Sequence, residues 1–232
     1  GGGEYYGTSE IEVNGSDLEG VIVPMRPGAV VRGRVVDELG EPVGAPVMVT
    51  LVAAGGRQSP SPPPARTYSD GSFRIEGVFG QQRVRAVEAR MVPGAEAPGI
   101  NVRRLQEVTA ATRARTTWWL KSVVVDGRDV TDEAIEVPER GATIEITMTN
   151  RASSVRGSVS WDRTRRPAKP VVVVFADDDT RWTRPSRFVG TSEVGDDARF
   201  DVRGLPAGPR YLAVAVEGTS RAAASRPSSG QG

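Results

Sequence analysis

The sequence predicts an all-β protein with two tandem antiparallel β-sandwiches. Three observations predict this: the two halves of the 232-residue chain repeat one another, short segments alternate apolar and polar residues, and turn-forming residues are frequent. The 27 glycines and 17 prolines form about a fifth of the chain, where roughly 12% is usual. Alternating β-branched residues fit a pleated sheet that is buried on one face.

The repeat has an offset of 124 residues. Short anchor sequences keep their order in both halves, and three further residues are inserted in the second copy before the last two anchors. The shared order indicates that one strand pattern is written twice. The anchors pair Ile11–Val13 with Ile135–Val137, Val31–Gly33 with Val155–Gly157, Val47–Val49 with Val171–Val173, Asp70–Phe73 with Asp197–Phe200, and Gly77–Val78 with Gly204–Leu205.

Each copy begins with two strands joined by a turn, at residues 30–52 and 154–176. In the first copy Asp70-Gly71 then forms a turn, because glycine accepts positive φ and aspartate bonds its own backbone. The second copy has Ala198 in place of that glycine, which leaves the type of its turn open. After each turn, alternation places two apolar side chains in the interior, namely Phe73 with Ile75 and Phe200 with Val202.

The stretch between the two copies is less regular. Residues 83–117 are interpreted as an irregular insertion, within which Val102, Leu105 and Val108 have helical spacing. Seven arginines and three glutamates lie between Gly80 and Arg115, which fits a solvated loop or an anion-binding face. Two further strands are expected in residues 118–127 and 135–150.

These segments predict four regions. Residues 1–28 hold N-terminal strands, interpreted as the end of an upstream module. Residues 29–150 form the first sandwich, with the insertion at about 83–117. Residues 151–217 form the second sandwich, and residues 218–232, which lack an apolar pattern, form a disordered tail. The chain begins Gly-Gly-Gly, so we expect a piece of something longer.

Composition excludes several functions. The chain has no Cys and no His, which rules out thiolate or imidazole metal sites, cysteine nucleophiles and Ser-His-Asp triads. We therefore expect no enzyme activity, no cofactor and no metal. The net charge of +1 gives no electrostatic footprint for nucleic acid. The longest apolar run, Val171–Ala176, is far shorter than the roughly 20 residues of a membrane-spanning helix.

The pattern V-x-G-x-V, D-x-x-G-x-P, V-x-V and D-G-x-F-x-I-x-G resembles the carboxypeptidase regulatory-like domain. The resemblance covers roughly residues 8–217 and implies transthyretin-like (prealbumin/Ig-like) sandwiches, within a wider class with a carbohydrate-binding-like fold. In the second copy, "GLPAGPRYLAVAV" is similar to the family's closing sequence. The residues that carry the resemblance are Val31, Gly33, Val35, Asp37, Gly40, Pro42, Val47, Val49, Asp70, Gly71, Phe73, Ile75 and Gly77, then Val155, Gly157, Val159, Val171, Val173, Phe200, Val202, Gly204, Leu205, Pro206, Gly208 and Tyr211.

The resemblance implies a fold more than a function, because such modules are joined to peptidases, outer-membrane receptors and adhesins alike. Residues 118–132 and 171–188 resemble tandem modules of large bacterial envelope proteins. We therefore expect a non-enzymatic structural or interaction module of a larger exported protein, extracellular, periplasmic or in the cell envelope. Its expected partners are other domains of a longer chain or other envelope proteins. A carbohydrate-binding module that uses exposed Trp, with polysaccharide as partner, and a regulatory appendage of a peptidase or receptor domain stay open as alternatives.

The resemblance also implies how each module closes, because in this family the closing strand follows a tight turn. Residues 144–149 would close the first sandwich, and by repeat correspondence residues 21–25 would close a module upstream of residue 1. The second copy stops after Val216 without such a strand, so an open edge with unpaired backbone groups is expected. The N-terminal strand of another chain, or a downstream segment, would complete that edge.

Tryptophans are the main candidates for a binding site. Trp118, Trp161 and Trp182 lie near expected strand ends or loops, where exposed indoles can stack on sugar rings. Trp182 is flanked by Arg181 and Arg184, which also suits a cation–π contact. Packing in the core or between domains is the competing interpretation.

Two further candidates involve charged residues. Asp177–Asp179 could offer carboxylates to Ca²⁺ with Asp196 and Asp197, but consecutive aspartates lack the alternating spacing of calcium loops, which favours a solvated turn. Lys121 and Lys169 invite comparison with the self-forming Lys–Asn bonds of some adhesins. No Asn of this chain lies at a convincing terminal-strand position for that chemistry.

Overall fold

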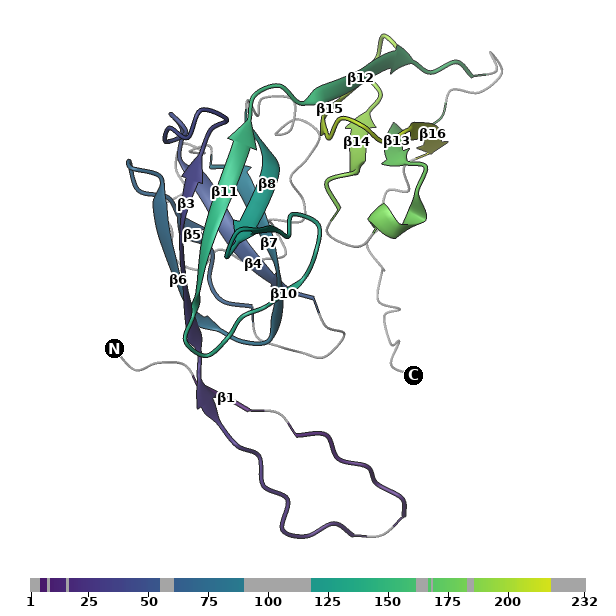
Figure 1. The fold of residues 1–232 in the computed structure, drawn as a ribbon. Coiled ribbons are helices and arrows are strands. Elements are labelled where there is room, and N and C mark those ends of the chain that lie inside the picture. Colours follow the sequence, from purple (N-terminus) through teal and green to yellow (C-terminus); the bar gives the residue numbers. More distant parts are fainter. Residues whose placement is uncertain are drawn as a thin grey trace, which may run out of the picture. The chain divides into compact units, whose positions relative to one another are not determined.

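The computed structural model describes residues 5–7, 9–15, 17–54, 61–89, 118–161, 167, 169–182 and 186–217. These residues are all-β, and the one helical segment among them is the 3-10 turn η1 (Asp179–Trp182). Within this part of the chain, no helix has the length and apolarity needed to cross a membrane. The described residues divide into two compact units, unit 1 up to Ala152 and unit 2 from Ser153 (Figure 1).

Unit 1 consists of two sheets and a short N-terminal pair, β1 (Tyr5–Tyr6) with β2 (Arg26–Pro27). One sheet contains, in spatial order, β6 (Ser72–Val78), β3 (Ala29–Val36), β11 (Ala142–Thr149), β8 (Trp119–Val125) and β9 (Arg128–Asp129). The other contains β10 (Ile135–Glu136), β7 (Gln81–Glu88), β4 (Val47–Ala53) and β5 (Ala65–Arg66).

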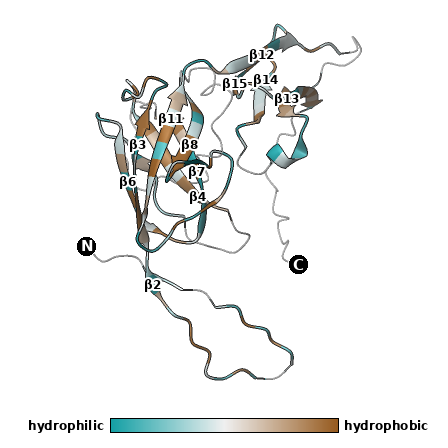
Figure 2. Ribbon diagram, in the orientation of Figure 1, coloured by the Kyte–Doolittle hydropathy of each residue, from teal (hydrophilic) through white to brown (hydrophobic). Residues whose placement is uncertain are grey.

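The core of unit 1 contains residues from both sheets. Phe73 and Ile75 on β6 are 3% and 2% exposed, so their expected interior position is confirmed. They belong to one buried cluster with Val49 and Leu51 of β4 and with Ile144 of β11. Figure 2 shows the apolar residues concentrated on the strands of this unit. Burial of these aliphatic and aromatic side chains, each contributing about 1.5–3 kcal/mol, stabilises the two-sheet arrangement.

One strand pair departs from the predicted antiparallel arrangement. β11 runs parallel to β3, with Ile144 beside Gly33 and Ile146 beside Val35. The physical reason is the connection, since a direct hairpin enforces antiparallel pairing but a long crossover does not. Between β3 and β11 the chain passes through β4 and β7 of the other sheet, so the direction in which β11 returns is free of the hairpin constraint.

Unit 2 repeats part of this plan. A two-stranded sheet pairs β12 (Ser153–Ser158) with β15 (Arg199–Leu205), as β3 pairs with β6. A three-stranded sheet has the order β14 (Val189–Glu193), β13 (Pro170–Ala176) and β16 (Tyr211–Glu217), as β5, β4 and β7 are ordered in unit 1. The buried cluster of unit 2 is small and contains Val172, Val174, Val202 and Leu205.

The same cross-strand pair of glycine and phenylalanine occurs in both units. Gly33 of β3 lies opposite Phe73, and Gly157 of β12 lies opposite Phe200. A Cβ atom at Gly33 would lie 2.6 Å from the Phe73 ring, and one at Gly157 would lie 2.9 Å from the Phe200 ring. Each ring therefore covers the backbone of a glycine on the neighbouring strand, which is where a side chain would clash.

The turns before β6 and β15 have the same hydrogen bonds, although one contains Ala198 and the other Gly71. The Gly71 N–H donates to the Tyr68 carbonyl at 3.0 Å, and the Ala198 N–H donates to the Gly195 carbonyl at 3.0 Å. Both residues have positive φ, 81° for Gly71 and 62° for Ala198. The turn type is therefore retained, and Ala198 holds a backbone conformation that disfavours a Cβ by about 1–2 kcal/mol.

The two units differ in which face of the second sheet is buried. Val49 pairs with Ala86 and Val173 pairs with Val214, as the repeat predicts. Val49 is buried in unit 1, whereas in unit 2 the alternate residues Val172 and Val174 are buried and Val173 is only half-buried. Because Val171–Ala176 is apolar on both faces, alternation cannot decide which face packs inward.

The expected N-terminal strands, insertion and tail can be compared with the structure only in part. Residues 9–25 contain no strand among those described, because a strand with no neighbour leaves its backbone unpaired. β7 continues regular structure to Glu88, beyond the expected start of the insertion near residue 83. The helical spacing at 102–108 and the tail at 218–232 lie outside the described residues.

We predict opposite effects for two substitutions at the equivalent turn positions. Ala198→Gly should stabilise unit 2 by up to about 1 kcal/mol, because it relieves the positive-φ strain and loses part of that gain to unfolded-chain entropy. Gly71→Ala should destabilise unit 1 by about 1–3 kcal/mol, because a Cβ there would also lie 2.4 Å from the Val35 carbonyl oxygen. Hydrogen exchange of β15 and β6 peptides measures each unit separately, and a loss of protection in Ala198→Gly would contradict the prediction.

Candidate interaction surfaces

The first candidate surface is the unpaired edge of β12, which we call the β12 edge. In unit 1, β3 lies between β6 and β11, whereas among the described residues β12 pairs only with β15. The β12 residues are exposed apart from Val155, which is half-buried. An unpaired strand edge presents a row of N–H and C=O groups that can bond a further strand.

The second candidate surface consists of the described residues 7, 9–15 and 17–25, which we call the N-terminal arm. Figure 1 shows it as a loop that extends beyond the β1–β2 pair. Its base is attached to unit 1, since the Tyr6 ring lies 5.3 Å from that of Phe79 and the Arg26 guanidinium donates to Glu139 at 2.6 Å. The arm itself exposes large apolar side chains, namely Ile11, Val13, Leu18, Val21, Ile22, Val23 and Met25.

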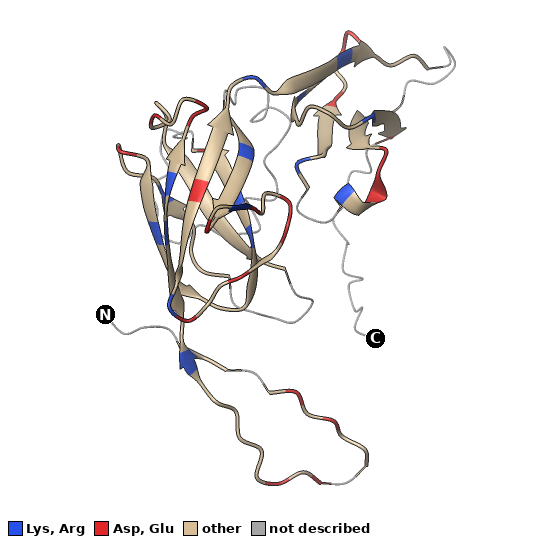
Figure 3. Cartoon of the chain, viewed as in Figure 1, with Lys and Arg blue, Asp and Glu red and all other residues tan. Residues whose placement is uncertain are grey.

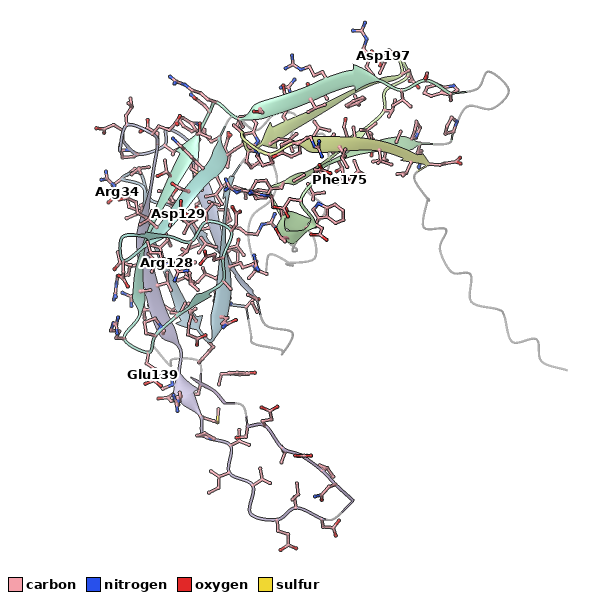
Figure 4. All side chains as sticks on the ribbon, turned by 45° about the vertical axis from the view of Figure 1, so that its right-hand side comes forward. Arg34, Arg128, Asp129, Glu139, Phe175 and Asp197 are labelled. Atoms are coloured by element: carbon pink, nitrogen blue, oxygen red, sulfur yellow. The ribbon has the colours of Figure 1, made fainter. Side chains whose placement is uncertain are left out.

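The third candidate surface is the outward face of β13 and β16, which we call the β16 face. Leu212, Val214 and Val216 are 44%, 44% and 46% exposed. Phe175, labelled in Figure 4, lies opposite Leu212 and in edge contact with Trp182 at 5.1 Å. The residues that pair in the same way in unit 1, which are Val49 with Ala86 and Leu51 with Val84, are all buried.

Charged residues of both signs are distributed along the described strands and loops (Figure 3). One cluster links the two strands of the β12–β15 sheet, because Asp201 faces Arg156 across the pair. The Arg203 guanidinium donates to the Asp201 carboxylate at 2.8 Å, and that of Arg156 lies 3.3 Å from it. Hydrogen bonding by Arg203, followed by the charges of both arginines, lowers the pKa of Asp201.

The Asp177–Asp179 segment does not gather its carboxylates. Asp177 accepts hydrogen bonds from Arg210, one of them at 2.7 Å, and Asp178 accepts from the Thr180 hydroxyl at 2.6 Å and from Arg181. The Thr180 hydrogen bond lowers the pKa of Asp178. No group of three potential metal ligands occurs among the described residues, so the arrangement fits the solvated turn better than a calcium loop.

The candidate tryptophans lie in different environments. Trp118 is half-buried and packs against the core of unit 1, and Trp161 in unit 2 is also half-buried. Trp182 is 44% exposed, and its indole N–H donates to the Ala176 carbonyl at 2.7 Å. The structure therefore does not bring Trp118 together with the other two in one unit, and sugar stacking stays a prediction.

Lys121 forms an exposed ion pair. Its Nζ atom lies 2.6 Å from a Glu38 carboxylate oxygen, and the Thr149 hydroxyl donates to the other oxygen at 2.9 Å. The Lys121 hydrogen bond lowers the pKa of Glu38. A buried lysine beside an asparagine is required for a self-forming Lys–Asn bond, and this solvent-exposed ammonium lacks that setting.

The β16 face is the surface that sequence reasoning missed. A signal for this face is present in the sequence. The segment "YLAVAV" has apolar residues on both faces of the strand, whereas the equivalent strand of the first copy carries Arg83 and Arg85 on one face. That difference becomes informative only once the pairing of β13 with β16 shows which side chains share a face.

Comparison with known proteins finds no matching family model and no matching curated protein. Among solved structures, the TIE protein of Bacillus anthracis matches 92% of this chain and 36% of its own, at 10% identity and a TM-score of 0.29. A DUF3823 family protein from Bacteroides ovatus matches 84% and 83%, at 15% identity and a TM-score of 0.27. A streptococcal ancillary pilin matches 91% and 66%, at 13% identity and a TM-score of 0.28. This chain thus spans about a third of the Bacillus anthracis protein, and TM-scores this low do not establish a shared fold.

The Asp201 cluster predicts an acid-dependent stability of unit 2. Because folding lowers the pKa of Asp201 from 3.8, its carboxylate stabilises the folded chain fully above that pH, and the effect declines as the pH falls from 3.8 through the lowered pKa. Wild type should exceed Asp201→Asn in free energy of unfolding by about 1 kcal/mol near neutral pH and by a smaller amount at a pH below 3.8. Urea titrations at the two pH values measure this, and a pH-independent difference would contradict it.

Proposed function

We propose that the chain is a non-enzymatic structural or interaction module of a larger exported bacterial protein. In this proposal the units are tandem β-sandwiches of the carboxypeptidase regulatory-like type, at residues 29–150 and 151–217, with residues 1–28 belonging to an upstream module. The module acts in the cell envelope or outside the cell. Its partners are other domains of a longer chain or other envelope proteins.

The observation that carries the proposal is the β16 face. Its side chains are apolar and exposed, although their counterparts in unit 1 form buried core. Contiguous exposed apolar surface on a soluble protein marks an interaction site more often than a chance feature. The acidic groups that could suggest chemistry, Asp177, Asp178 and Asp201, are each engaged by arginine, which favours a surface that binds over one that reacts.

Photo-crosslinking in the native envelope tests this function. A photoreactive residue at Val214 of the full-length protein should give discrete adducts, identified by mass spectrometry as another segment of the same chain or another envelope protein. A photoreactive residue at Asp197, which is exposed in the turn before β15, is the matched control and should give few. Equal labelling at the two positions, or none at Val214, would remove the basis of the proposal.

The adducts also separate the main proposal from the regulatory alternative. If the partner of Val214 is a peptidase or receptor domain of the same polypeptide, the module is an appendage of that domain. If the partner is a repeated module or a separate envelope protein, its role is structural.

Carbohydrate binding is the second candidate, and the exposed part of the Trp182 indole favours it. Titration with cell-wall polysaccharide should then quench tryptophan fluorescence in a saturable way in wild type but not in Trp182→Ala. Trp118→Phe is the control, because Trp118 packs against the core of unit 1. Under the main proposal, no saturable change occurs in any of the three proteins.

A further inference from the structure

The N-terminal arm carries the apolar pattern of β11. In β11 every second residue from Ile144 is fully buried in the core of unit 1, and the arm has exposed apolar residues at the same spacing. The residues between them differ, since they are Glu145 and Thr147 in β11 but Ile22 and Pro24 in the arm. The repeat anchor Ile135–Val137 precedes β11, and the matching anchor Ile11–Val13 precedes the apolar residues of the arm at nearly the same sequence distance. The equivalent sets are Ile144, Ile146 and Met148 in β11 and Val21, Val23 and Met25 in the arm.

β12 retains the feature by which β3 accepts β11. A Cβ atom on Gly33 would lie 2.1 Å from the Ile144 carbonyl oxygen, so the approach of β11 requires glycine at that position. Gly157 is the equivalent residue, yet the only described atoms near its Cβ position belong to the Phe200 ring. The glycine of β12 thus leaves room for a strand that the described residues do not supply.

We propose that residues 18–23 of one copy of this chain pair in parallel with the β12 edge of a second copy. Val21 of the donor lies beside Gly157 of the acceptor and Val23 beside Val159, as Ile144 lies beside Gly33 and Ile146 beside Val35. The inference rests on the proposed function and revises one part of it. It names the partner of the interaction module as another copy of this chain, whose unit 2 takes the place of the upstream module for residues 18–23.

Both the β12 edge and the arm contribute to the free energy that favours their pairing. Neither the free edge of β12 nor residues 18–23 of the arm pair with a strand among the described residues. The Ile22 carbonyl accepts from the Ser9 hydroxyl at 3.1 Å, and a parallel ladder replaces that single bond with several, as in other cases of strand addition. Val21 and Val23 add apolar side chains beside the small buried cluster of unit 2. Pro24 has no N–H, so the paired segment ends before it, and the β1–β2 pair keeps the base of the arm on its own unit 1.

Directed disulfide formation between two differently tagged chains tests the register. Ile22→Cys is placed in one chain and Ser158→Cys in the other, and each chain then has a single cysteine because the native sequence has none. In the proposed register these residues are neighbours on the outward side, as Glu145 and Arg34 are in unit 1. Mild oxidation should give a disulfide-linked heterodimer with Ser158→Cys but not with Ser154→Cys, which lies about 13 Å further along the strand.

Sedimentation velocity over a range of protein concentrations tests the energetics. Val23→Asp should weaken self-association at least about tenfold because it buries a carboxylate, whereas Ile22→Asp, on the outward side, should not. In both chains hydrogen exchange of β15 should stay close to wild type, because the substitutions lie in the arm and not in unit 2. That measurement separates a lost contact at the edge from an unfolded unit.

Two results would overturn the proposal. The first is a chain that stays monomeric at every concentration and forms no heterodimer above the Ser154→Cys control. The second is a double Ile22→Cys, Ser158→Cys chain that closes its disulfide within one monomer, which would make the occupant the same chain. Neither result depends on the adducts at Val214, so this inference and the proposed function fail separately.

Discussion

Both units depend on the contact between a glycine on one strand and a phenylalanine ring on its neighbour. At Gly33 the ring of Phe73 and the backbone of β11 approach from different sides, so a side chain there would displace one of the two sheet neighbours of β3. Gly157 and Phe200 repeat the pair in unit 2, where only the ring is present among the described residues. The pair fixes the register of β3 with β6 and of β12 with β15, and the burial of each sheet follows from that register.

The difference between the units arises on the second sheet. In unit 1, the face of β4 and β7 that packs inward is centred on Val49, Leu51, Val84 and Ala86. The opposite face mixes apolar residues with Arg83 and Arg85, and these two arginines favour its outward position. In unit 2, β13 and β16 are apolar on both faces, and each face can serve as core. In the structure the face with Val172 and Val174 packs inward, and Leu212, Val214 and Val216 on the other face are exposed. The buried cluster among the described residues of unit 2 is small, and a domain of this size gains only a marginal stability from its own core. Covering the β16 face would therefore add to the stability of unit 2.

The repeat and the alternation of apolar residues together predicted most of the strands in their order along the chain. Particular residues explain where this prediction failed. Phe73, Ile75 and Val202 are buried as expected because each strand has one apolar face, whereas Phe200, also expected in the interior, is only half-buried. The parallel direction of β11 was missed because local sequence encodes turns, not the path of a crossover. The arm alternates polar and apolar residues over residues 10–13, but it pairs with no other strand among the described residues, and a sequence pattern alone cannot supply a partner. The tryptophans illustrate a third limit, since Trp118 and Trp182 have similar sequence settings and different burial.

The apolar character of β13 also affects the risk of aggregation while the chain is still folding. Five consecutive residues from Val171 to Phe175 are β-prone, uncharged and free of proline, which is the composition of segments that nucleate aggregates when they are transiently unpaired. Pro170 precedes this run and Asp177–Asp179 closely follows it. Such flanking residues act as gatekeepers, since proline cannot extend an intermolecular ladder and three negative charges repel a stacked neighbour. The acidic triplet, whose spacing favours a solvated turn, thus also has the composition of a gatekeeper for the strand beside it.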